Sequence, residues 1–435
     1  MARNRLGSPS HFQARDSGVV CNPRNGVLDQ VKLRRNFPLF NCSRRRAAKH
    51  GSTLNDSPIH PGTWLFSLSR RRCRIPRQLL IFFAGLSASL CFSVLGQPLR
   101  IVVAGDSRGD YPWNPPRCCD NEGVNEIVTK AISNAVLNEN AAILLWTGDI
   151  VNVNDTNEDT LKRGLEKWRG IMEPLYSKNV KVWPVRGNHE VYRVLSSDNR
   201  DGEPIPNSAA IWKEVFSASY ALPNNAPTSD DGLSFYSVEG SALIVGLDQY
   251  ASQNPDPLTR KHLVNQKWLD EVLNQNKQAF TFVYGHEAAF KAGVHNDDDT
   301  LAADASIRNL FWQSLIKAKA LYFCGHDHFY DRMRVVRRTS PPGPEIFQIT
   351  AGTAGAPFYT GAQYAGSDLW KLERAAHFEN VYGYMLIEVD GNKATITFKG
   401  RGLSCRDKTG QVAFVPMDQM VCEPSGCKTI ACQAP

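Results

Sequence analysis

Polar side chains that can bind metals recur just after the apolar segments of this chain, each beside a glycine. The segments are residues 99–104, 141–147, 180–185, 280–284 and 321–324, and their β-branched and aromatic content predicts strands. The side chains that follow them are Asp106, Asp149, Asn188, His286, His326 and His328. Strand ends hold the bases of loops rigidly, and glycine lets the backbone turn sharply there. Carboxylates, imidazoles and an amide oxygen suit Mn²⁺, Fe or Zn²⁺ better than an all-oxygen calcium cage. The pattern therefore predicts a metal site built from loops far apart in the sequence.

The remaining periodicity indicates how the body of the chain is organised. Helical spacing of apolar residues occurs at residues 122–138, 161–176, 258–274 and 305–318, and further strands are expected at 233–238, 242–247, around 335, 346–350, 384–389 and 394–398. Early strand–helix alternation followed by strand-rich sequence predicts two packed sheets flanked by helices. Trp268 and Trp312 are expected in the core, His262 on a helix surface and His377 outside the functional cleft.

The positive charge of the chain is concentrated at its N-terminus. Residues 1–78 hold 16 Lys and Arg against 3 Asp and Glu without a persistent period, which predicts a basic, disordered extension. An apolar run at 79–95 follows, and the small residues Val94 and Gly96 fit a cleavage site. Residues 79–96 are therefore expected to be a secretory signal, with an uncleaved anchor and a buried helix as alternatives. The remaining residues carry a mild acidic excess, which disfavours nucleic-acid coating.

Cysteines cluster at the other end of the chain. Four of the 11 cysteines lie in the last 31 residues, at Cys405, Cys422, Cys427 and Cys432. In an exported protein this cluster predicts a disulfide-stapled tail over residues 401–435, and three pairings remain open. A zinc knuckle is the alternative, although no His and no paired Cys-x-x-Cys supports it. Cys324 lies in an apolar run and is expected to be a buried thiol.

The order of the strand-end motifs resembles that of calcineurin-like metallophosphoesterases, from about Leu99 to Lys399, within a domain expected at 97–400. Several stretches are similar to the purple acid phosphatase branch of that family. They are the GHDHFYDR stretch at 325–332, the QKWL stretch at 266–269, the glycine-rich loop at 352–356 and the YGY stretch at 382–384. The resemblance implies an α/β fold, a four-layer α/β/β/α sandwich in which helices flank two mixed β-sheets, with a dinuclear metal site.

The resemblance also implies a role for each motif residue. Two divalent or mixed-valence ions (Mn, Fe or Zn) would share the carboxylate of Asp149 as a bridge. One ion would also be held by Asp106 and His328, and the other by Asn188, His286 and His326. His189 would not be a ligand and would instead meet the phosphate or the leaving-group oxygen, a task that suits a near-neutral pKa.

Two positions depart from the family pattern. The first block commonly reads Asp-x-His, whereas here it reads Asp106-Ser107-Arg108. The purple branch has a tyrosine ligand three residues after the bridging Asp, and here that residue is Asn152. The ion beside Asp106 is therefore expected to bind weakly, and no Fe(III)–tyrosinate chromophore is expected. Arg108 is expected to grip the substrate phosphate through its fork of N–H donors, with a plain ion pair to a nearby Asp as the alternative.

Together these features predict a secreted, periplasmic or extracellular metal-dependent phosphoesterase that resembles an acid phosphatase. By the resemblance, a metal-bridging hydroxide would attack phosphorus in a phosphate monoester, assisted by His189 and Arg108. A phosphodiesterase is the alternative enzyme, because the same site serves both reactions. A non-catalytic phosphate-binding module with a degraded metal site is the alternative of another class, and Arg108 and Asn152 favour it. The expected partner is a phosphorylated small molecule or other phosphoester, and membrane contact is expected only if residues 79–95 stay uncleaved.

Overall fold

The computed structural model describes residues 97–109, 123–152, 158–194, 201–216, 222–250, 262–293, 301–339, 346–402 and 413–430. All of them lie within one compact unit, Leu90–Pro435. The extension predicted at 1–78 and the signal predicted at 79–96 lie outside the described residues, as do Cys405 and Cys432. Within the described ranges, every helix is too short or too polar to cross a membrane.

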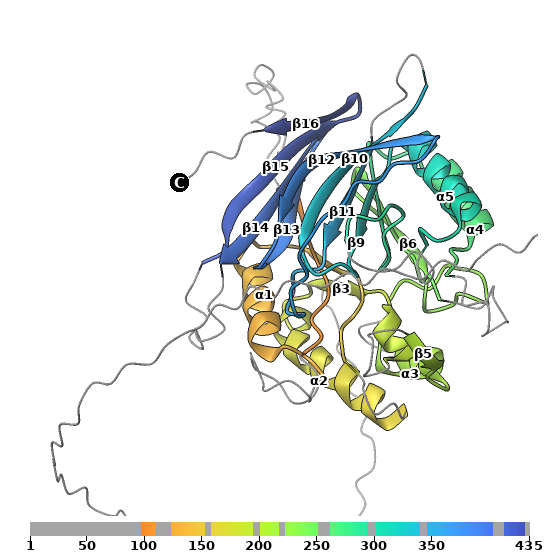
Figure 1. Cartoon of the computed structure of the whole chain (residues 1–435). Helices are drawn as coiled ribbons and strands as arrows, with labels where there is room; N and C mark the ends of the chain where they lie inside the picture. Colours follow the sequence, from red (N-terminus) through yellow and green to blue (C-terminus); the bar gives the residue numbers. More distant parts are fainter. Residues whose placement is uncertain are drawn as a thin grey trace, which may run out of the picture. The chain divides into compact units, whose positions relative to one another are not determined.

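Two seven-stranded mixed sheets form the centre of this unit (Figure 1). The strands of the first sheet are β1 (Leu99–Ala104), β2 (Ile143–Trp146), β3 (Lys181–Pro184), β13 (Val381–Asp390), β14 (Lys393–Gly402), β15 (Val415–Glu423) and β16 (Gly426–Ile430). Those of the second are β6 (Phe235–Glu239), β7 (Ala242–Gly246), β8 (Phe280–Tyr284), β9 (Leu321–Cys324), β10 (Tyr330–Arg337), β11 (Ile346–Ala351) and β12 (Trp370–Phe378). The strand orders are β16-β15-β14-β13-β1-β2-β3 and β12-β10-β11-β9-β8-β7-β6. A separate ribbon pairs β4 (Tyr192–Val194) with β5 (Asp201–Pro204).

The strands that precede the motif residues pair in parallel with one another within each sheet. In the first sheet β1 pairs with β2 and β2 with β3 in parallel, and in the second sheet β7, β8 and β9 do the same. Their residues are apolar on both faces, as in the ILLW sequence of β2, which is buried throughout. Sheets of parallel strands need cover on both faces, and this explains the continuous apolar runs seen in the sequence.

Helices cover the outer faces of the two sheets. The buried residues of α1 (Glu126–Asn138), α2 (Glu158–Tyr176) and α3 (Ser208–Val215) join the core of the first sheet. Those of α4 (Gln266–Gln275) and α5 (Ala305–Ala318) pack on the second sheet. Along β7 the side chains alternate, since Ile244 faces the core between the sheets while Leu243 and Val245 face α4 and α5. The predicted four-layer sandwich is therefore confirmed.

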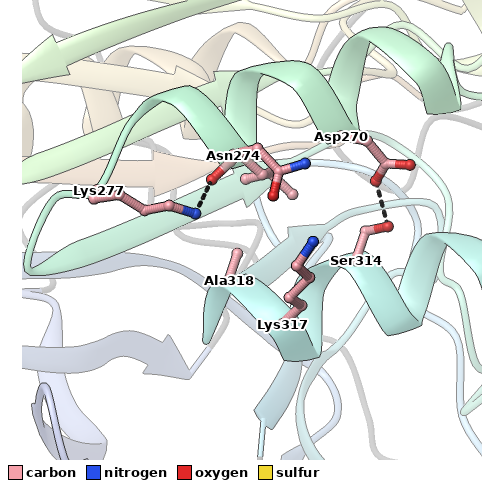
Figure 2. Close-up of a pocket in the computed structure, with 7 residues that line it drawn as sticks. Asp270, Asn274, Lys277, Ser314, Lys317 and Ala318 are labelled. Atoms are coloured by element: carbon pink, nitrogen blue, oxygen red, sulfur yellow. Dashed lines mark hydrogen bonds between the residues drawn. The ribbon is translucent and has the colours of Figure 1, made fainter.

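The seam between α4 and α5 contains a shallow pocket (Figure 2). Its lining includes Asp270 and Ser314, which are hydrogen-bonded to each other across the two helices. Gln266 also donates to the Ser314 hydroxyl across the seam, at 2.9 Å. These contacts tie the helices together, and none of the residues that line the pocket is a predicted site residue.

The region before α4 corrects one prediction. Asn265 caps α4 by accepting the backbone N–H of Trp268, so the helix predicted from residue 258 begins only at Gln266. His262 therefore precedes the helix, and it is buried against Glu287 and stacks on Tyr192. The expected surface position of His262 was wrong, because helical periodicity does not show where the chain turns inward. Trp268 and Trp312 do lie in the core, as predicted.

The C-terminal residues extend the first sheet. The boundary predicted at residue 400 falls inside β14, and the predicted tail supplies β15 and β16. Cys422 and Cys427 lie opposite each other on these two strands and form a disulfide. That pairing leaves neither of them as a thiolate for a zinc knuckle. Cys324 is a buried free thiol, as predicted.

Candidate metal centre

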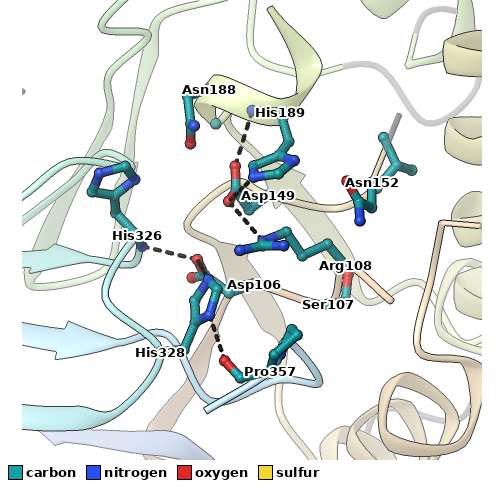
Figure 3. A network of polar contacts seen from close by, with 12 residues as sticks. Asp106, Ser107, Arg108, Asp149, Asn152, Asn188, His189, His326, His328 and Pro357 are labelled. Carbon is teal, nitrogen blue, oxygen red and sulfur yellow. Dashed lines mark hydrogen bonds and ion pairs between the residues drawn. The ribbon is translucent and has the colours of Figure 1, made fainter. Parts of the chain in front are cut away.

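The two sheets bring all the predicted site residues together where their parallel strands end (Figure 3). Asp106 follows β1, Asp149 follows β2, and Asn188 opens a 3₁₀ turn after β3. His286 follows β8, while His326 and His328 follow β9. Together with Arg108 and His189, every one of these residues is at most 7% exposed. Such burial of charged and imidazole groups needs compensating partners.

Four atoms that can bind a metal, His286 Nε2 and three others around it, lie close together; we call them the four-donor group. In His286, Nε2 lies 3.0 Å from Asn188 Oδ1, 3.1 Å from His326 Nδ1 and 3.2 Å from Asp149 Oδ1. Its Nδ1 lies 2.8 Å from the carbonyl oxygen of Thr147, to which only an N–H can donate. In the neutral ring, Nε2 then carries a lone pair, and this lone pair faces the oxygen atoms of Asn188 and Asp149. A cation among these atoms satisfies all of them, so this four-donor group fits a metal ion.

The second predicted metal position, beside Asp106 and His328, has fewer atoms that can bind an ion. Asp106 Oδ1 accepts the backbone N–H of His326 at 2.9 Å and lies 3.7 Å from His328 Nε2. The Nδ1 atom of His328 donates to the carbonyl of Pro357 at 2.6 Å, which leaves Nε2 facing Asp106. Asp106 Oδ2 is buried and has no hydrogen-bond partner among the described residues. Burial and the neighbouring charge of Asp149 raise the pKa of Asp106 well above its usual value.

Backbone conformation at the site is unusual for three of the predicted ligands. Asp106, Asp149 and His326 have φ angles of 64°, 48° and 70°, in the left-handed region that residues with a Cβ seldom adopt. A Cβ atom on Gly187 would lie 2.2 Å from Asp149 Oδ1, so only glycine fits there. Strained backbone of this kind clusters at functional sites, where the surrounding structure holds it in place.

Glu190 is a site residue that the sequence reasoning missed. Its carboxylate is fully buried and accepts the backbone N–H groups of Asp149, Ile150, Val151 and Gly187 at 2.7–3.1 Å. Burial and the charge of Asp149 raise the pKa of Glu190 to about 8, against the effect of these hydrogen bonds. The carboxylate therefore fixes the loop that carries Asp149. Its only sequence signal is its place directly after Asn188 and His189.

Arg108 and His189 both face the other oxygen of Asp149. Arg108 Nε lies 3.6 Å and His189 Nε2 lies 3.7 Å from Asp149 Oδ2. Burial raises the pKa of Asp149, but the charges of His286, His189 and Arg108 outweigh it and hold the pKa below its usual value. The ion pair considered as the alternative role of Arg108 is thus present, while its contact with phosphate stays a prediction.

Tyr359 was also missed, because it lies in a loop far from every motif. Its hydroxyl accepts a hydrogen bond from Arg108 Nη2 at 2.9 Å. Its ring stacks on His328 with 4.0 Å between centroids and 17° between planes.

Asn152, at the position of the tyrosine ligand in the purple branch, donates from Nδ2 to the carbonyl of Gly109 at 3.3 Å. Figure 3 shows Asn152 beyond Arg108 as seen from Asp106.

Comparison with known families accounts for this arrangement. The model of the family described as calcineurin-like phosphoesterase matches residues 99–330, which is more than half of the chain. The chain belongs to the calcineurin-like phosphoesterase family. Members of this family are typically hydrolases of phosphoesters that use dinuclear metal sites, and Asp106, Asp149 and His286 offer ligand atoms within 4.8 Å of one another. No curated protein sequence matches the chain.

Solved structures of PhoD and of a purple acid phosphatase are similar to this calcineurin-like phosphoesterase. A structure of PhoD has a TM-score of 0.53 at 11% identity, over 78% of this chain and 72% of that one. The purple acid phosphatase PPD1 from yellow lupin (Lupinus luteus) seeds has a TM-score of 0.50 at 15% identity, over 78% of this chain and 57% of that one. At such low identity these likenesses show the shared fold and leave the substrate open.

Proposed function

We propose that this calcineurin-like phosphoesterase hydrolyses phosphate monoesters with a metal ion held by Asn188, His286, His326 and Asp149. The observation that carries the proposal is the convergence of three donor atoms within 3.2 Å of His286 Nε2. The donor set suits Mn, Fe or Zn. When bound, the ion would act as a Lewis acid on the phosphoryl group and lower the pKa of water. This chemistry needs the ion of the four-donor group, whether or not a second ion binds beside Asp106 and His328.

The chain supplies two groups for the substrate. Arg108 has five N–H donors in a planar fork, enough to keep its contact with Tyr359 and also donate to a phosphoryl oxygen. His189 has its Nε2 3.7 Å from Asp149 Oδ2, and imidazole can hold and give a proton near neutral pH. We assign His189 the role of giving a proton to the leaving-group oxygen.

Two other functions remain as alternatives. A phosphodiesterase would use the same donors, and the choice depends on how the substrate is seated. A non-catalytic phosphate-binding module is favoured by one observation, the place of Arg108 at 3.6 Å from Asp149 where the family commonly has a histidine ligand two residues after Asp106.

Initial rates on p-nitrophenyl phosphate and on bis-p-nitrophenyl phosphate test these functions. We expect turnover of the monoester to be the faster, to stop with a chelator and to return when Mn²⁺ or Zn²⁺ is added. Faster turnover of the diester would favour the phosphodiesterase. A metal-loaded chain that binds phosphate without any turnover would favour the binding module. The variant Asp149→Asn is expected to lose both activity and bound metal, because its carboxylate belongs to the four-donor group.

We propose in addition that the protein is exported to the periplasm or the cell exterior. The apolar run at 79–95 and the Cys422–Cys427 disulfide support this, since disulfides persist in oxidising compartments. Mass spectrometry of the native protein tests the proposal. We expect its mature N-terminus at Gln97, and native protein that retains residues 1–60 would contradict the signal.

A further inference from the structure

Arg108 carries a permanent positive charge and is buried beside Asp149. We infer that its guanidinium takes the place of one of the two metal ions, so that this chain binds a single resident ion in the four-donor group. The inference rests on the metal site of the proposed function and not on its turnover.

The guanidinium is fixed between two groups. Its Nε lies 3.6 Å from Asp149 Oδ2, and its Nη2 donates to the Tyr359 hydroxyl at 2.9 Å (Figure 3). The side chain is 4% exposed, so water contributes little to its solvation. Asp149 therefore divides its oxygens, with Oδ1 near His286 and Oδ2 facing Arg108. The oxygen available to a second ion is the one that the arginine already faces.

Tyr359 links the guanidinium to the other ligands of the second position. Tyr359, which accepts from Arg108, stacks on His328 with 4.0 Å between ring centroids. His328 Nε2 in turn lies 3.7 Å from Asp106 Oδ1. The guanidinium thus faces Asp149, a carboxylate that a second ion would use, and a divalent ion placed beside it would be repelled with little screening.

Neither of the family's additional donors for that position is present. The residue two positions after Asp106 is Arg108 instead of histidine, and the residue three positions after Asp149 is Asn152 instead of tyrosine. Asn152 donates from Nδ2 to the carbonyl of Gly109. The second position therefore offers Asp106, His328 and the shared Asp149 beside a fixed positive charge, which is a poorer fit for a resident ion than the four-donor group.

Metal content of the full chain tests the inference. The protein is stripped with a chelator, reloaded with Mn²⁺ or Zn²⁺ and desalted, and its metal is measured by inductively coupled plasma mass spectrometry. We expect about one ion per chain in the wild type and about two in Arg108→His, which restores an imidazole and removes the fixed charge. Arg108→Lys keeps the charge and is expected to stay at about one ion. Two ions per chain in the wild type would overturn the inference, as would two in Arg108→Lys.

A second measurement does not depend on the folding of any variant. Electron paramagnetic resonance of Mn²⁺-loaded wild type is expected to show the hyperfine pattern of an isolated ion, and an exchange-coupled spectrum would overturn the inference. Failure of the proposed function has a different signature. One ion per chain without hydrolysis would support the single-ion site and contradict the proposed hydrolase. Two ions per chain with hydrolysis would support the hydrolase and contradict the single-ion site.

Discussion

At the residue scale, Asp149 connects every part of the site through its two oxygens. Oδ1 accepts the backbone N–H of His189 at 3.2 Å and lies equally close to His286 Nε2, while Oδ2 faces Arg108. Two unit charges about 4 Å apart interact by roughly 4 kcal/mol at an effective dielectric constant of about 20. A second divalent ion at that distance from Arg108 would therefore meet about twice that repulsion. This repulsion opposes the binding of a second ion beside Arg108.

Replacing His189 tests its separation from the metal ligands. We expect His189→Ala to retain bound metal and to lower kcat by roughly 10²–10⁴-fold, the usual effect of losing a general acid. Metal is retained because the contact of His189 with Asp149 Oδ1 comes from the backbone N–H, which alanine keeps. Steady-state kinetics with metal analysis measures both effects. Asn188→Ala is the matched control and is expected to lose metal, while loss of metal in His189→Ala would show that we have misassigned the residue.

At the element scale, β10 links the metal loop to the C-terminal hairpin. Tyr330 and Arg332 lie two and four residues after His328, but their side chains contact Asp418 on β15 instead of the site. Arg332 binds Asp418 through two hydrogen bonds of 2.7 and 2.9 Å, and Tyr330 donates to the same carboxylate at 2.7 Å. Arg332 also donates to Thr429 on β16 at 3.0 Å. These residues of the GHDHFYDR stretch therefore fasten one sheet to the other.

Removing the carboxylate from this buried pair should be costly. We expect Asp418→Ala to lower the free energy of unfolding by about 3–5 kcal/mol, because it leaves the Arg332 charge buried without its partner. Urea denaturation measures the change. Glu214→Ala removes the carboxylate of an exposed ion pair with Lys162 and is the matched control, expected to change stability little. Equal effects of the two substitutions would contradict a structural role for Asp418.

A second cross-strand pair makes stability depend on pH. His377 on β12 lies opposite Asp331 on β10, and its ring nitrogens lie 3.1 Å from Asp331 and 3.1 Å from Glu379. Burial lowers the pKa of His377, but its hydrogen bonds to Asp331 and Glu379 outweigh burial and raise the pKa above its usual value. A raised histidine pKa stabilises the fold below the unfolded pKa, and this stabilisation is lost as pH rises through the folded pKa.

The melting temperature of metal-saturated protein should therefore fall with pH in a way that depends on His377. We expect wild-type protein to lose stability from about pH 6.5 upward, and His377→Gln to show a flatter profile over the same range. Thermal melts between about pH 6 and about pH 9 provide the comparison. Parallel profiles for the two proteins would mean that the pair does not titrate in this range.

At the scale of the whole molecule, the site exists only when the two sheets pack together. The first sheet supplies Asp106, Asp149 and Asn188, and the second supplies His286, His326 and His328. Buried side chains of both sheets form one core, in which Trp183 of β3 packs against Phe235 of β6 with 6.1 Å between ring centroids. Metal binding and folding are coupled for this reason, because an unfolded chain has no preformed site.

Removal of metal should lower thermal stability. An ion at about 100 times its Kd stabilises the native state by about 2.7 kcal/mol, and for a domain of this size that corresponds to roughly 4 °C in Tm. Melting curves with a chelator and with added Mn²⁺ or Zn²⁺ measure the shift. Asp149→Asn, whose site lacks one donor, is expected to show a much smaller shift. An equal shift in both proteins would place the stabilising metal elsewhere.

The sequence by itself determined the strands that lead into the site and the motif residues at their ends, but it gave no sign of β12, β15 or β16. Residues 280–284, 321–324 and 305–318 were predicted with the bounds that β8, β9 and α5 have in the structure. These segments are fully buried runs or a capped helix, whose signals are local. Glycine beside each polar strand end indicated the loops of the site, and the family resemblance supplied the layering of the sheets.

Tertiary structure alone decided which groups face one another across the site. Tyr359 lies 251 residues from Arg108, and Asp418 lies 86 residues from Arg332, so no local pattern connects either pair. The burial of His262 and the use of Glu190 to hold the Asp149 loop likewise depend on chain segments that meet only after folding. The sequence specifies the chemistry of each side chain. The packing of the two sheets decides which partner it contacts, and therefore where each buried charge is compensated.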